Sequence, residues 1–359
     1  MCTVSLCMIV RDEEQVLGRC LNSVAGLADE IIIVDTGSTD ATPRIAAAYT
    51  DKVYDFPWQD DFAVARNAAF DRATCDFCLW LDADDVLLAA DRQELARLKN
   101  RLDDTVDVVM LRYNTGFDDQ GRPAFGYYRE RLVRRAAGFR WQGAVHEVID
   151  TSQARGRVLW SDCAVTHWKL GCPDPQRNLR IFEGLLHRGA RLDLRQQFYY
   201  ARELYYNRRY GEALAVFGRF LAAEGGWLEN RLEACRQMAY CWYALGRRDK
   251  ALGALLQSLA YDRPRAETCC DLGAHFMGEE AWDQAVYWFR QALACPRNDR
   301  QGGFVLSDAY GYIPCLQLCV CMSRLGDNEQ AAIYNEQAAA YKPDSPAVLH
   351  NREYFASIK

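Results

Sequence analysis

The chain has 359 residues, of which 50% are hydrophobic and 26% charged. At about 100 to 200 residues per domain, this length predicts two or three domains, and the composition excludes a globally disordered chain. The net charge of −6 arises in the N-terminal half, where residues 1–170 hold 20 Lys and Arg against 27 Asp and Glu. A half with that balance repels a phosphate backbone, so no nucleic-acid partner is expected unless a metal ion intervenes.

Targeting signals and cysteine usage indicate where the protein works. The longest apolar runs fall far short of the ~18 residues of a membrane-spanning helix, so no transmembrane segment is expected. The first residues lack the basic start and apolar stretch of a secretory signal, which predicts a cytoplasmic protein. The 15 cysteines are odd in number and sit inside apolar patterns, which favours buried free thiols. The single Cys-x-x-Cys pair, Cys75 and Cys78, lacks the second pair of ligands that a zinc site needs.

The N-terminal half alternates short apolar runs with amphipathic stretches, a pattern typical of strands joined by helical crossovers into a mainly parallel sheet. In chain order, this pattern predicts strands at 4–10, 30–34, near 53 and at 77–81, with helices at 14–25, 42–49 and 63–73. From Val106 onward, turn-like segments separate the apolar runs, which predicts antiparallel strands and an irregular region. A glycine and two prolines within residues 171–175 mark the expected domain boundary.

Beyond this linker, long helix-forming segments repeat a pattern in which a turn residue leads to a helix that begins near an alanine. Four alanines align in register, with spacings of 38, 34 and 46 residues: Ala213, Ala251, Ala285 and Ala331. In three copies, a proline positioned to end the second helix follows 11 to 13 residues later: Pro264, Pro296 and Pro343. Over residues 195–346, the pattern resembles the tetratricopeptide repeat, whose helix pairs stack so that each buries its apolar face on the next.

The repeat resemblance implies a surface suited to a peptide or protein, and exposed ends of the array through which a homodimer could form. A plain helical bundle with no binding role is the alternative. The expected domains are therefore 1–170, an α/β domain; 171–194, a linker with a first helix; and 195–359, an all-α repeat domain.

The most informative polar cluster is Asp82-Ala83-Asp84-Asp85, which directly follows an apolar strand. Carboxylates at i and i+2 on a chain end can present oxygen ligands to Mg²⁺ or Mn²⁺, and the ion bridges them to substrate phosphates. A solvated turn or a helix N-cap explains the same residues without a metal. On its own, the cluster leaves both interpretations open.

A second polar loop, residues 35–40 with the sequence Asp-Thr-Gly-Ser-Thr-Asp, follows the strand at 30–34. Ligand sites of open α/β sheets form at the carboxyl ends of strands, as here. Asp-Thr-Gly-Ser also occurs in aspartic proteases, but such an enzyme needs a second Asp-Thr-Gly or an all-β homodimer, and this loop leads into a helix at Thr42. Together with Arg66 and Asn67, the two loops closely resemble those of family 2 glycosyltransferases of the GT-A fold.

By that resemblance, residues 3–170 form a cytosolic-type transferase domain that takes its sugar from a nucleotide donor. The resemblance implies that Asp35 accepts from the uracil N–H of a UDP-sugar and that Asp82 and Asp84 form the metal-binding D-x-D, with Mn²⁺ or Mg²⁺ as cofactor. The segment after the first strand, where the family usually ends in Asn-Glu, here has Asp12 at the Asn position. The donor-binding residues implied are Arg11, Glu13, Asp35, Ser38, Asp40, Arg66, Asn67, Asp82 and Ala83.

A third cluster places His146 beside Glu147, and a further histidine, His167, comes late in the domain. If the reaction inverts the anomeric centre, one carboxylate must deprotonate the acceptor while the metal stabilises the departing diphosphate. Glu147 is the candidate base, and His146 is expected to contact donor or acceptor. By resemblance, a histidine late in the domain completes the metal shell with Asp82 and Asp84, and His167 fits that order better than His146. A purely structural role remains the alternative for each histidine.

The segment from Phe56 to Phe62 matches a branch of these transferases that includes sublancin-type peptide S-glycosyltransferases and lipopolysaccharide core enzymes. The resemblance therefore leaves a polypeptide or a glycan as acceptor, and the repeats favour a polypeptide. The contrasting hypothesis is a catalytically inactive transferase-like domain that supports a peptide-binding scaffold.

Overall fold

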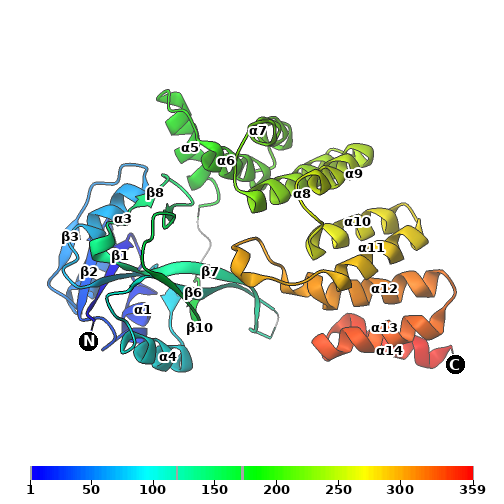
Figure 1. The fold of residues 1–359 in the computed structure, drawn as a ribbon, viewed down its shortest axis with the longest axis horizontal. Coiled ribbons are helices and arrows are strands. Elements are labelled where there is room, and N and C mark those ends of the chain that lie inside the picture. The colour runs from blue at the N-terminus through cyan, green and yellow to red at the C-terminus, as the bar shows by residue number, and fades with distance from the viewer. Residues whose placement is uncertain (1, 119, 171–173, 359) are drawn as a thin grey trace. The chain divides into compact units, whose positions relative to one another are not determined.

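The computed structural model describes residues 2–118, 120–170 and 174–358, and it divides into two compact units, Met1–Arg191 and Leu192–Lys359 (Figure 1). The predicted boundary at 170 adjoins residues 171–173, which lie outside the described residues, and it stays a prediction. Among the described helices, none is both long and apolar enough to cross a bilayer. The described cysteines are free thiols and most are buried, as expected.

The first unit is built on an eight-stranded mixed sheet with the order β3-β2-β1-β4-β7-β6-β10-β5. Its first four strands run parallel, as their continuous apolar stretches predicted. The strands of the sheet are β1 (Val4–Val10), β2 (Glu30–Asp35), β3 (Val53–Asp55), β4 (Phe77–Trp80), β5 (Asp85–Val86), β6 (Val106–Phe117), β7 (Pro123–Arg134) and β10 (Arg157–His167). A separate two-stranded ribbon pairs β8 (Trp141–Gln142) with β9 (Val148–Ile149).

Helices cover both faces of this sheet (Figure 1). One core contains apolar residues of α1 (Leu17–Ser23), α2 (Thr42–Ala47) and α4 (Ala89–Lys99). The opposite core contains α3 (Phe62–Phe70) and the β8-β9 ribbon. A 3₁₀ turn, η1 (Arg135–Ala137), follows β7, and α5 (Arg177–His187) ends the unit. The two cores fix the sheet edge from which the polar loops emerge.

The predicted antiparallel arrangement after Val106 is only half correct. Strands β6 and β7 pair antiparallel, and β7 also runs antiparallel to β4. Strand β10, however, pairs parallel with β6. An apolar pattern shows that a strand is buried but does not encode the direction of a partner that lies some 50 residues away, so this pairing was not predictable from spacing.

The second unit is a stack of antiparallel helix pairs, as the repeat pattern predicted (Figure 1). The four aligned alanines each lie in the second helix of a pair, and all four are fully buried. Their small side chains let the paired helices approach closely. The pairs are α6 (Leu194–Tyr206) with α7 (Tyr210–Ala222), α8 (Leu228–Ala244) with α9 (Arg248–Gln257), α10 (Ala266–Gly278) with α11 (Trp282–Ala294), and α12 (Tyr312–Arg324) with α13 (Asn328–Tyr341).

Three short elements and a final helix complete the unit. Helix α9 continues into η2 (Ser258–Ala260), and α14 (Pro346–Ser357) packs on α13. The spacing of 46 residues between the last two aligned alanines is explained by a longer connection from α11 to α12, which contains η3 (Asp299–Gln301) and η4 (Ser307–Tyr310).

Candidate functional site

The candidate site lies where β1, β2 and β4 end side by side. Residues 11–14 follow β1, residues 36–41 follow β2, and residues 81–84 follow β4. Because β1 lies between β2 and β4 with parallel register, the three polar loops emerge at one edge of the sheet. Open α/β sheets bind ligands at this edge.

The first two loops are held together by hydrogen bonds. Asp35 Oδ1 accepts from the backbone N–H groups of Gly37 at 2.8 Å and Ser38 at 2.7 Å, which closes a tight turn. Ser38 Oγ accepts from the N–H of Asp12 at 3.0 Å, and Asp40 Oδ2 accepts from the N–H of Glu14 at 3.1 Å. Ser38 and Asp40 therefore shape the loops through backbone contacts.

The second carboxylate oxygen of Asp35 is different. Asp35 is 3% exposed, and its Oδ2 is buried with no hydrogen-bond partner. A buried hydrogen-bond acceptor that lacks a partner destabilises the folded state. At a ligand-binding edge, such an atom marks a place where an N–H or O–H group of a ligand would fit.

Arg66 of α3 links two carboxylates from different parts of the chain. Its Nε lies 2.6 Å from Glu147 Oε1, and its Nη2 lies 2.6 Å from Asp82 Oδ1. The guanidinium sits between two indoles, with its Cζ 5.1 Å from the ring centroid of Trp80 and 4.8 Å from that of Trp141. Burial alone would lower the pKa of Arg66, but Asp82 and Glu147 raise it above its ordinary value. For Asp82 the directions are reversed: burial alone would raise its pKa, but the positive charges of Arg66 and Arg131 lower it below its ordinary value.

Asn67, the next residue of α3, points its amide at backbone. Its Nδ2 donates to the carbonyl of Trp141 at 3.0 Å, and its Oδ1 accepts from the N–H of the same residue at 3.0 Å. Both ends of the side chain thus fix strand β8 against α3. This contact holds one of the two indoles that enclose Arg66.

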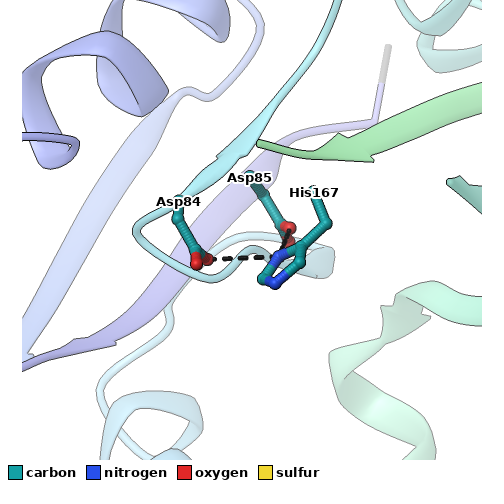
Figure 2. Close-up of side chains that lie close together, drawn as sticks. All are labelled: Asp84, Asp85 and His167. Atoms are coloured by element: carbon teal, nitrogen blue, oxygen red, sulfur yellow. Dashed lines mark hydrogen bonds and ion pairs between the residues drawn. The ribbon is translucent and has the colours of Figure 1, made fainter. Parts of the chain in front are cut away.

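A second cluster joins Asp84, Asp85 and His167 (Figure 2). His167 Nδ1 lies 3.3 Å from Asp84 Oδ1 and 3.2 Å from Asp85 Oδ1. One ligand atom from each residue lies within 4.8 Å of the others, which is the spacing of a cation site. Two carboxylates and an imidazole form a donor set that suits Mn²⁺ and accommodates Mg²⁺.

The fold positions this cluster through β5 and β10. His167 and Asp85 are register partners in that antiparallel pair. Asp85 is fully buried, its Oδ2 lies 2.9 Å from Arg131 Nη1, and the same oxygen accepts from the N–H of Asp82 at 3.0 Å. The Tyr113 hydroxyl lies 3.0 Å from His167 Nδ1. Asp85 is thereby held rigidly behind Asp84.

The carboxylates also control the protonation of their neighbours. Burial opposes charge on His167, but hydrogen bonds to Asp84 and Asp85 raise its pKa to about 10. Glu13 lies near the same carboxylates, and burial together with Asp84 and Asp82 raises its pKa to about 7. The site therefore concentrates negative charge that a bound cation would neutralise.

Comparison with known proteins gives this geometry a family. The model of "Glycosyl transferase family 2" matches residues 5–160, which include all of the polar loops at the sheet edge. Residues 5–160 form a family 2 glycosyltransferase domain.

Curated relatives carry two kinds of name. "TPR repeat-containing protein Synpcc7942_0270" of Synechococcus elongatus is 38% identical over 170 residues, 47% of this chain and 40% of the relative. "SPbeta prophage-derived glycosyltransferase SunS" of Bacillus subtilis is 29% identical over 40% of this chain and 34% of the relative. "Lipopolysaccharide core biosynthesis glycosyltransferase LpsC" of Rhizobium meliloti is 31% identical over 41% of this chain and 56% of the relative. The chain thus spans between about a third and somewhat over half of these relatives' lengths.

Solved structures are similar to about half of the chain, at low identity. One is titled "Crystal structure of YrrB: a TPR protein with an unusual peptide-binding site", with a TM-score of 0.37 and 15% identity over 50% of this chain and 84% of that chain. Another, "MamA 41-end from Desulfovibrio magneticus RS-1", has a TM-score of 0.38 and 16% identity over 48% of this chain and 89% of that chain. The repeat architecture of the second unit rests on its own stacked helix pairs.

Within the first unit, the predicted site residues fall into several settings. Asp82, Arg66 and Glu147 come together, and so do Asp84 and His167. The side chain of Arg11 is half exposed and lies 3.8 Å from the Asp12 carboxylate. The remaining two are Ala83, which is buried in the core, and His146, which adopts a left-handed backbone with a φ of 52°.

The structure also adds residues that the sequence reasoning missed. Asp82 pairs with Arg66, and the cluster of Asp84 with His167 also contains Asp85, which was not among the predicted metal ligands. Asp85 was visible as the third carboxylate of its run, although local sequence could not show which of the three faces His167. Arg131 and Tyr113 contact the cluster from β7 and β6, and no local motif marked them.

Proposed function

We propose that this protein is a metal-dependent, inverting glycosyltransferase that moves a hexose or N-acetylhexosamine from a UDP-sugar to a polypeptide or glycan acceptor. The observation that carries the proposal is the placement of the Asp84-Asp85-His167 cluster at the same sheet edge as the unpartnered Asp35 Oδ2. The cluster suits a divalent cation, and Asp35 Oδ2 suits an N–H group of a nucleobase. The family 2 match supports glycosyl transfer as the reaction.

The nucleotide would lie against the loops that follow β1 and β2. Asp35 Oδ2 is a buried acceptor, and uracil N3–H is a donor of the matching kind. The other carboxylate oxygen of Asp35, Oδ1, accepts two backbone N–H groups, and these hydrogen bonds fix the orientation of the carboxylate. Arg11 and Glu13 belong to the β1 loop, which is hydrogen-bonded to the β2 loop through Ser38 and Asp40, and we assign them to the donor as well.

Asp84, Asp85 and His167 would hold the metal ion, with Asp82 beside them. A divalent cation held by these residues would supply positive charge against the departing diphosphate. Asp82 is tied to Arg66, and we assign this pair to the donor sugar and diphosphate side of the site. Ala83 keeps the turn between the two aspartates compact because its side chain is buried in the core.

Glu147 is the proposed base. Inversion requires one carboxylate that takes the acceptor proton, and Glu147 is connected to Asp82 through Arg66. The two ion pairs fix the distance from the base to the metal-binding turn. We place the neighbouring His146 at the acceptor, and Asn67 acts by positioning Trp141.

The first experiment is calorimetric titration of the whole chain with UDP-glucose, UDP-N-acetylglucosamine, UDP-galactose and GDP-mannose, in Mn²⁺ and in EDTA. We expect one UDP-sugar to bind, and only with the metal. Asp84→Ala should abolish both binding and transfer, whereas Asp51→Asn, an exposed carboxylate in the α2-β3 connection, should change neither. Metal-independent binding, or full activity of Asp84→Ala, would contradict the proposal. If no donor binds, the inactive peptide-binding scaffold becomes the better hypothesis.

A further inference from the structure

The connection between α11 and α12, residues 295–311, is here called the insert. The third and fourth aligned alanines are 46 residues apart, against 34 and 38 for the other spacings, and the insert accounts for the excess. It contains η3 and η4, so it follows a defined path. A longer connection was not needed to join the two helix pairs, and its path shows what the extra residues do.

The middle of the insert reaches the first helix pair. The ring of Phe304 lies 6.0 Å from that of Phe198 on α6, and the Arg202 guanidinium lies 4.7 Å from the Phe304 centroid. Phe198 and Arg202 are four residues apart, so they share one face of α6. Phe304 therefore contacts a helix about 100 residues earlier in the chain through an aromatic and a cation–π contact.

The insert also bonds to α10. Glu267 Oε1 accepts from the N–H of Leu306 at 2.7 Å, and Glu267 Oε2 accepts from the Tyr310 hydroxyl at 3.1 Å. Cys270, on the same face of α10, donates its thiol to the carbonyl of Ala309 at 3.6 Å. A side-chain acceptor that takes a backbone N–H is the kind of contact that holds an extended peptide irrespective of its sequence.

Two glycines let the insert approach the start of α8. A Cβ on Gly303 would lie 2.7 Å from Glu229 Oε2, and one on Gly302 would lie 3.3 Å from the Trp227 ring. The insert thus touches the first helices of three consecutive pairs. We call the surface it covers the first-helix face, defined by Phe198, Arg202, Glu229, Glu267 and Cys270.

The first-helix face is one continuous surface because neighbouring first helices are linked directly. The rings of Tyr205 on α6 and Tyr240 on α8 lie 6.4 Å apart. Arg236 Nε on α8 donates to Asp271 Oδ2 on α10 at 2.7 Å. The face therefore persists without the insert, because its framework contacts are made among the repeats.

The middle of the insert, residues 302–306, packs on this face less closely than a core element would. A cavity of about 30 Å³ remains between them, lined by Glu233, Arg236 and Thr268 on the repeat side and by Gly303, Phe304 and Val305 on the insert side. Leu306 is 38% exposed. The end of the insert is anchored differently, because Ala309 is 1% exposed and lies with Tyr310 in the core formed with α10, α11 and α12. The middle of the insert lacks such an anchor, and a segment with few buried apolar contacts opens at low free-energy cost.

We propose that the middle of the insert, residues 302–306, is a dissociable, built-in occupant of the first-helix face, and that an extended polypeptide with an aromatic residue competes with it for that face. The occupant shows the recognition chemistry: a backbone N–H to Glu267, an aromatic ring between Phe198 and Arg202, and small residues over α8. In the proposed transferase, this polypeptide is the acceptor, so the inference rests on the proposed function only for the identity of its partner.

The test uses the full chain and a fluorescently labelled synthetic peptide with the sequence of residues 298–311. In the wild-type chain, the tethered insert reduces the fraction of open face, so the free peptide should bind weakly. Phe304→Ala in the chain weakens the tethered copy and should raise peptide affinity at least tenfold, measured by fluorescence anisotropy. A peptide carrying the same substitution should lose binding to this variant.

The matched control is Leu306→Ala in the chain, which removes an exposed side chain and keeps the backbone N–H that Glu267 accepts. Its peptide affinity should equal that of the wild type. A second variant, in which a Gly-Ser sequence of equal length replaces residues 302–306, should bind the peptide at least as tightly as Phe304→Ala. The proposal would be overturned if all chains bound the peptide with equal affinity. It would also be overturned if neither Phe304→Ala nor the Gly-Ser variant bound the peptide. Donor titration is a separate readout: lost donor binding with intact peptide competition contradicts only the proposed function.

Discussion

His167 Nδ1 lies 3.2 Å from the buried carboxylate of Asp85, its register partner across the β5-β10 pair. Asp84 adds a second carboxylate at 3.3 Å from the same nitrogen. In the metal-free protein, a proton on the imidazole serves as the countercharge of both carboxylates. The same proton would have to leave before the imidazole could bind a cation.

This relationship predicts how stability depends on pH without metal. The pKa of His167 is raised from its ordinary 6.5 to about 10 in the folded chain. The contribution of the protonated imidazole to the free energy of unfolding is fully present below pH 6.5 and is lost as the pH rises through about 10. Between these two values the folded state holds a proton that the unfolded state lacks, so each rise in pH favours unfolding. Denaturation in EDTA should show stability falling by up to about 1.4 kcal/mol per pH unit in that window. His167→Gln should flatten this slope, and an unchanged slope would contradict the assignment.

Arg66 provides a second prediction, on stability. Arg66→Ala would leave Asp82 and Glu147 without their shared partner, and removal of one member of a buried ion pair costs about 3–5 kcal/mol. The exposed pair of Arg140 with Asp71 is the control, and Arg140→Ala should cost about 1 kcal/mol or less. Urea denaturation of both variants measures the difference. Equal losses would show that the buried pairs contribute no more than a surface pair.

The parts of the fold that were predictable are those encoded locally. Continuous apolar stretches identified the parallel strands β1 to β4, and the aligned alanines identified the helix pairs, because both patterns reflect which side chains are buried. The parallel pairing of β10 with β6 was not predictable, since an apolar pattern carries no information about a partner's direction. The path of the insert was likewise hidden, because only its length stood out in the sequence.

The candidate site was predictable to a similar depth. Polar loops after buried strands indicated where ligands would gather, and this required no long-range contact. Which carboxylate meets which partner depends on residues far apart in the chain: Arg66 lies 81 residues from Glu147, and Asp85 lies 82 from His167. Only the three-dimensional register decides that Asp85 faces the histidine while Asp82 pairs with Arg66.

Asp35 allows a prediction about base selectivity. Asp35→Asn keeps an oxygen for the Gly37 and Ser38 N–H groups but places an amide donor where the unpartnered oxygen was. Uracil N3 is a donor and cytosine N3 is an acceptor, so UDP affinity should fall about 10- to 100-fold while CDP affinity rises. Calorimetry with both nucleotides in Mn²⁺ tests this exchange. If UDP and CDP affinities change in parallel, Asp35 does not read the base.

The repeat helices offer a prediction on stability that depends only on the space around glycine. Gly218 in α7 and Gly253 in α9 lie within helices, and a Cβ added at either would meet nothing within 4 Å, so alanine there should raise the free energy of unfolding by about 0.5–1 kcal/mol each. At Gly273 in α10, an added Cβ would lie 2.7 Å from the Phe289 ring. Gly273→Ala should therefore destabilise the unit although the helix propensity improves equally. Thermal melting of the three variants separates the two effects, and a stabilised Gly273→Ala would show that α10 and α11 can move apart at no cost.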